Sequence, residues 1–162
     1  PGALGLIFAV GGVSSFLGAM IAGRIHHLGI GSVMIGALLL AALGEAFTPL
    51  ATAANAVGIV FLVGQQLLGD AALTVFEINQ VSLRQAIAPP EVIGRVNASL
   101  RVGEFGALLA GTIAAGALGE VIGLRGTLWL GVGATLLAAL ILALSPVRIV
   151  QRLPASPVEV VA

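Results

Sequence analysis

The sequence predicts an all-α fold, a polytopic membrane bundle of five transmembrane helices. Of the 162 residues, 59% are hydrophobic and only 9% are charged, whereas ordinary soluble domains carry about a quarter charged residues. With a mean hydropathy of +1.15, the chain has too few polar residues to cover a surface in water, so its solvent is lipid. The apolar segments are too long and continuous for a membrane barrel. Helices remain, because a chain in lipid must satisfy its own backbone hydrogen bonds.

Five segments are long enough to cross a bilayer. A membrane helix needs roughly 20 mostly apolar residues, because the hydrocarbon core is about 30 Å thick and each residue rises about 1.5 Å. The segments cover residues 3–23, 31–47, 55–80, 96–118 and 126–144. The sequence therefore predicts a transmembrane bundle over residues 1–146, followed by a cytoplasmic tail over residues 147–162. Pro89 and Pro90 are expected to end the third helix, since proline lacks the donor N–H and clashes with the preceding turn.

The arginines predict the orientation of the chain, because short basic loops stay in the cytoplasm. The second loop, TPLATAAN, has no charge, whereas basic residues mark the first loop, the third loop and the tail: Arg24, Arg84, Arg95, Arg148 and Arg152. We therefore expect a multi-pass protein of the inner, cytoplasmic membrane whose first residues lie outside and whose C-terminus lies in the cytoplasm. Because the chain starts without Met, we interpret it as a piece of a longer protein.

Composition argues against several other classes of protein. The formal net charge is zero and there is no cysteine, so nothing points to nucleic acid or to disulfides. A membrane-embedded enzyme needs a converging nucleophile or metal cluster, and the only histidines are the adjacent His26 and His27 of the first loop. We interpret this pair as a solvated turn. We expect no enzyme activity, no catalytic residue, no metal and no cofactor.

Two segments resemble the major facilitator superfamily. GAMIAGRIHHLG, with Gly18, Gly23, Arg24 and Gly29, resembles the loop between the second and third helices of each half. NQVSLRQAIAPPEVIGRVNAS is similar to the cytoplasmic turn between the fourth and fifth helices of the C-terminal half, in the branch of siderophore exporters and transmembrane secretion effectors. Within this second segment, the residues that carry the resemblance are Arg84, Gly94 and Arg95.

This resemblance implies that the five spans are helices eight to twelve of a twelve-helix transporter, with the N-terminal half as the missing partner. It further implies proton-driven efflux of a small molecule, siderophore or drug-like, by an antiporter. The alternative is a small structural or assembly subunit of the membrane without transport activity, which would need no polar face inside its helices.

Polar residues within the third span share one face. At about 100° per residue, all five fall within an arc of roughly 80°: Gln66, Asp70, Glu77, Gln80 and Arg84. Ionisable groups at membrane depth are costly and tend to face a cavity and carry function. We expect this face to line a substrate or ion pathway, with Asp70 as its deepest acid. The other interpretation is that Glu77, Gln80 and Arg84 form the solvated cytoplasmic end of the helix.

The remaining acids suggest smaller roles. Arg101 and Glu104 are three residues apart on the fourth span, so opposite charges can meet on one face. Glu104 is a candidate pathway residue, and a structural clamp between helices is an equally good interpretation of the pair. Glu45 lies near the outer end of its span and is expected to be a solvated cap. Glycines and alanines along the fourth span predict close helix packing.

Overall fold

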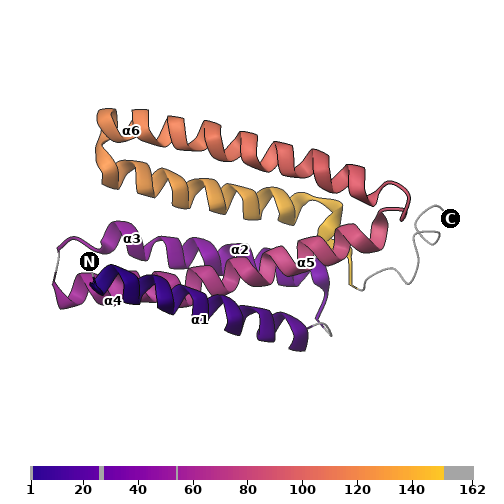
Figure 1. Ribbon diagram of the computed structural model, residues 1–162, viewed down its shortest axis with the longest axis horizontal. Helices are drawn as coiled ribbons and strands as arrows, with labels where there is room; N and C mark the ends of the chain where they lie inside the picture. The colour runs from indigo at the N-terminus through magenta and orange to yellow at the C-terminus, as the bar shows by residue number, and fades with distance from the viewer. Residues whose placement is uncertain (1, 26–27, 54, 152–162) are drawn as a thin grey trace.

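The structure, a computed structural model, describes residues 2–25, 28–53 and 55–151 (Figure 1). Helices and connecting turns account for these residues, and no strand occurs among them. In chain order the elements are α1 (Gly2–Arg24), α2 (Ile30–Glu45), α3 (Phe47–Leu50), α4 (Ala56–Gln65), a π-helical segment η1 (Gln66–Asp70), α5 (Ala71–Ile87), α6 (Ile93–Leu144) and a 3₁₀ turn η2 (Pro146–Ile149). The prediction of an all-α fold is confirmed.

Within the described ranges, three helical runs are long and apolar enough to cross a membrane. They are Ile30–Leu50 with 21 residues, Ala56–Ile87 with 32 and Ile93–Leu144 with 52. A membrane helix needs only roughly 20 residues. The chain therefore has the helices of a membrane protein, as its composition predicts, and two of the runs exceed the length that a single crossing requires.

The run from Ala56 to Ile87 extends seven residues beyond the predicted span of 55–80. It begins after Asn55, whose side chain accepts a hydrogen bond of 3.0 Å from the backbone N–H of Gly58, which is the usual role of an N-cap residue. It ends at Ile87, and Ala88 has extended dihedral angles of φ −78° and ψ 129°. A residue before proline is driven out of the helical region by the ring, so the helix end predicted from Pro89 and Pro90 is confirmed.

Helix α6 contains a sharp reversal instead of the loop expected between residues 118 and 126. Only Gly123 leaves the helical conformation, with φ 78° and ψ 159°. A positive φ costs glycine nothing because it has no Cβ. Figure 1 shows the chain doubling back at this end of α6, so that its two halves run in opposite directions. The residues on either side of Gly123 keep helical dihedral angles, so the reversal is confined to one residue.

Helix α2 lies at the centre of the packing. On one side Ile30 and Met34 pack with Leu83 of α5, and Leu142 at the end of α6 joins the same cluster. The residues after α6 also contact α2, because the Gly31 N–H donates a 3.1 Å hydrogen bond to the carbonyl of residue 150. The described start of the predicted tail is therefore packed on the bundle rather than free.

The first half of α6 contrasts with this core, because its apolar side chains are exposed along most of its length. Val102 is 74% exposed, Phe105 63% and Ile113 65%. A soluble monomer rarely exposes so continuous an apolar surface. This helix therefore requires lipid or another protein around it, which agrees with the membrane character of the composition.

Candidate functional site

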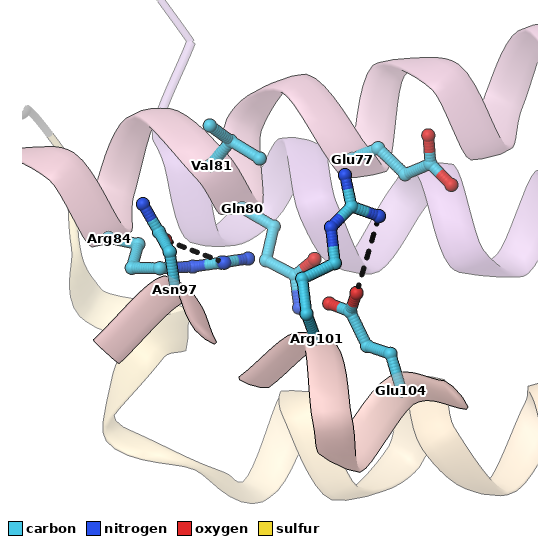
Figure 2. Close-up of a pocket in the computed structure, with 7 residues that line it drawn as sticks. All are labelled: Glu77, Gln80, Val81, Arg84, Asn97, Arg101 and Glu104. Atoms are coloured by element: carbon cyan, nitrogen blue, oxygen red, sulfur yellow. Dashed lines mark hydrogen bonds and ion pairs between the residues drawn. The ribbon is translucent and has the colours of Figure 1, made fainter. Parts of the chain in front are cut away.

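A polar cleft lies between α5 and the first half of α6 (Figure 2). Its volume is about 390 Å³ and it opens to the outside of the bundle. Seven residues line it: Glu77, Gln80, Val81, Arg84, Asn97, Arg101 and Glu104. Six of the seven are polar or charged, in two helices that are otherwise mostly apolar. Because charged side chains are costly against lipid, their concentration at one gap marks the candidate site.

The α-helical repeat places these side chains on facing surfaces. On α5 they occur at positions i, i+3, i+4 and i+7, starting from Glu77, and on α6 at i, i+4 and i+7, starting from Asn97. Such spacings put residues on one side of a helix. Since the short connection over residues 88–92 joins the two helices, Arg84 and Asn97 lie nearest the turn. Glu77 and Glu104 lie farthest from it, each seven residues further along its own helix.

One hydrogen bond and one ion pair connect the residues of the cleft. The Arg84 Nη1 donates to Asn97 Oδ1 at 3.1 Å, which links α5 to α6. Within α6, Arg101 Nη1 lies 3.8 Å from Glu104 Oε2, with side chains 73% and 49% exposed. The predicted pairing of Arg101 with Glu104 is confirmed. An exposed pair of this kind contributes only about 0–1 kcal/mol to stability, so both groups can exchange partners readily.

A second polar cluster lies deeper, around the π-helical segment η1. The Asp70 carboxylate accepts a hydrogen bond of 3.3 Å from Gln65 Nε2. A Cβ placed on Gly11 of α1 would contact Gln66 Nε2 and Asp70 Oδ2. The missing side chain at Gly11 therefore leaves the space in which these two polar groups sit, beneath α1.

Small residues hold η1 between α1 and α2. The hydroxyl of Ser14, which is 1% exposed, donates a 2.9 Å hydrogen bond to the carbonyl of Leu67. On the opposite side, a Cβ on Gly44 would overlap the backbone of Gly69. π-Helical turns interrupt the regular hydrogen-bond ladder and are frequent at functional sites. Here the buried Ser14 hydroxyl donates a hydrogen bond at the interruption, and Gly44 and Gly69 allow the backbones of α2 and η1 to approach closely.

The residues that were predicted to form one pathway fall into two groups in the structure. Glu77 and Glu104 line the cleft. Gln66 and Asp70 belong to the deeper cluster around Gly11, and Asp70 precedes Glu77 by seven residues, which is roughly 10 Å along the helix. The common face predicted for the third span therefore lies against α1 at its deep end and borders the open cleft at the end near the turn.

The residues of the two resembling segments are spread over the bundle. Gly18 packs against α5, because a Cβ there would lie 2.5 Å from the carbonyl oxygen of Ala71. Gly29 precedes α2. The other members are Gly23 and Arg24 at the exposed end of α1, Arg84 in the cleft, and Gly94 and Arg95, which are exposed at the start of α6. His26 and His27 lie outside the described residues.

Two features of the site were not anticipated from the sequence. Asn97 was not singled out, although its spacing of four and seven residues from Arg101 and Glu104 is the helical signal that identifies it. The prediction of a solvated Glu45 is wrong: its side chain is partly buried, and its Oε2 accepts a 2.8 Å hydrogen bond from the Thr135 hydroxyl of α6. Thr135 belongs to a helix 90 residues further along the chain, so no local pattern could reveal this contact.

Within the described part of the chain, no group of three or more His, Cys, Asp or Glu side chains is placed to hold a metal ion. The chemistry available in the cleft is therefore that of two guanidinium groups, two carboxylates and two amides, which bind polar or charged ligands through hydrogen bonds and ion pairs. No family model matches this chain, and comparisons with curated proteins and with solved structures find no match either.

Proposed function

We propose that this chain is the C-terminal part of an exporter of the major facilitator superfamily, which moves a small molecule out across the cytoplasmic membrane at the expense of a proton gradient. The observation that carries the proposal is the cleft between α5 and α6, where charged side chains gather in an otherwise apolar bundle. Intramembrane charges of this kind mark substrate and ion pathways.

In this proposal the chain crosses the membrane five times, as helices eight to twelve. α1 has 23 residues and would form one span. The two halves of α6 on either side of Gly123 would form two more, which accounts for the 52 residues of that element. The exposed first half of α6 would face lipid and the N-terminal half of the transporter. Transport would follow from rocking of the N-terminal and C-terminal halves of the transporter around a site near the middle of the membrane.

The two polar clusters would have different roles. One end of the cleft lies next to the turn between α5 and α6, on the side that the arginines predict to be cytoplasmic, so the cleft would be suited to receive a substrate from there. Asp70 lies two turns deeper in the helix. We assign the coupling step to this acid, because ionisable groups inside a membrane helix tend to carry function.

A transport assay tests this function. Inverted vesicles from cells that express the full-length protein are energised, and uptake of labelled anionic, cationic, neutral and zwitterionic small molecules is measured. We expect at least one class to accumulate until a proton ionophore is added. Asp70→Asn should reduce that accumulation tenfold or more while the amount of protein in the membrane stays normal. Full transport by Asp70→Asn would remove Asp70 from the coupling step.

One observation favours the alternative of a structural or assembly subunit, namely the exposed apolar surface of α6 around Val102 and Phe105, which a partner protein could cover. The same vesicles separate the two functions. If no compound accumulates above vesicles that lack the protein, the exporter is contradicted and the assembly role is the better description.

A further inference from the structure

Charges in the cleft are sorted along its length. Arg84 lies at the end near the turn, Arg101 in the middle, and Glu77 and Glu104 at the far end. Figure 2 shows the Arg101 side chain extending from α6 toward α5, with the Glu104 carboxylate beside it. The cleft thus has no net charge but has a positive end and a negative end.

The far end has two negative charges and only one positive charge to compensate them. Glu77 and Glu104 come from opposite helices at the same distance from the turn, and like charges that share a site repel each other. Arg101 compensates only one of them, at 3.8 Å from Glu104. Glu77 makes no hydrogen bond or ion pair with any residue that the structure describes. One negative charge at this end is therefore available to a ligand.

The end near the turn has the opposite surplus. A guanidinium carries five N–H donors in a planar fork that suits a carboxylate. At Arg84, the hydrogen bond to Asn97 Oδ1 is made by a single nitrogen, Nη1. The Cα atoms of Arg84 and Glu77 are seven residues apart, roughly 10 Å along α5. No ion pair joins these two residues in the structure, so a ligand with charge at both ends can contact both.

We infer that the cleft binds a small zwitterion, with its ammonium group at Glu77 and Glu104 and its carboxylate at Arg84 and Arg101. This inference rests on the proposed function, because it takes the cleft as the substrate site of the exporter. A ligand with one charge would match one end and leave the other uncompensated. The cleft has a volume of about 390 Å³, which is within the range of roughly 300–1,000 Å³ that is common for small-molecule sites.

A matched set of ligands tests the charge requirement. The full-length protein in lipid nanodiscs is equilibrated with radiolabelled ε-aminocaproate, a zwitterion. Unlabelled caproate, which has only the negative charge, and ε-aminocaproate methyl ester, which has only the positive charge, then compete for binding. We expect the zwitterion to bind about tenfold or more tightly than either competitor, because one charged hydrogen-bonding contact is lost in each. The shorter γ-aminobutyrate, whose charges are closer together, should bind more weakly.

Two substitutions locate the two ends of the ligand. Glu77→Gln should remove the preference for ε-aminocaproate over caproate, and Arg84→Gln should remove its preference over the methyl ester. The matched controls are Glu91→Gln and Arg95→Gln, which change the same charges at exposed positions outside the cleft. All four side chains are at least partly exposed, so the variants should fold, and circular dichroism in the nanodisc checks their helix content.

The outcomes separate this inference from the proposed function. Equal competition by all three compounds, or no binding of ε-aminocaproate, overturns the zwitterion site, even if the vesicles transport other molecules. Equal effects of Glu77→Gln and Glu91→Gln would likewise overturn it, because the cleft would then have no special role. Charge-selective binding without any transport supports the site and contradicts the exporter.

Discussion

Replacing Gly44 with alanine should separate α2 from the π-helical segment. A Cβ at this position would contact the backbone nitrogen of Gly69 and would lie 2.6 Å from its Cα and 3.2 Å from the carbonyl carbon of Leu68. Side-chain atoms can rotate away from such an overlap, but backbone atoms cannot. Overpacking of this kind costs about 1–3 kcal/mol. Gly36→Ala on the same helix is the control, because nothing lies within 4 Å of a Cβ there.

The two substitutions should have effects of opposite sign. Alanine at Gly36 should stabilise the helix by about 0.5–1 kcal/mol, since glycine loses more backbone entropy on folding. The two variants should then differ by about 1.5–4 kcal/mol, which corresponds to a Tm difference of roughly 3–16 °C in a chain of this size. Thermal unfolding in detergent, followed by the fluorescence of Trp129, the single tryptophan, measures the difference. If Gly44→Ala melts at or above Gly36→Ala, the close approach of α2 to η1 is refuted.

Two further predictions concern the π-helical segment and the orientation of the chain. Ser14→Ala should destabilise the protein by about 1–2 kcal/mol, because the Leu67 carbonyl loses its 2.9 Å hydrogen bond. The control is Ser15→Ala, which should change the melting temperature little because the Ser15 hydroxyl makes no hydrogen bond to any described residue. Equal effects of the two substitutions would contradict the reasoning. Single cysteines at Thr52 and Glu91 should differ in labelling by an impermeant thiol reagent in intact cells, with only Thr52 labelled, because basic loops stay inside; the reverse pattern would invert the topology.

The sequence alone determined the solvent and the class of secondary structure. A chain with 9% charged residues cannot cover itself in water, and lipid then requires helices. Local rules also predicted the end of α5 from Pro89 and the ion pair of Arg101 with Glu104, because both depend on neighbours within one turn. Had the same spacing rule been extended back to Asn97, it would have identified the α6 side of the cleft.

Only the tertiary structure decided which polar residues meet. Helical periodicity gives the direction of a side chain around its own axis, but it does not say which helix lies opposite. It could not show that Asp70 turns to the space left by Gly11 while Glu77 faces α6, or that Glu45 meets Thr135. Hydropathy was also a poor guide to loops. The span bounds predicted a loop between residues 118 and 126, yet the helical conformation continues to Gly123, where glycine's free φ permits the reversal.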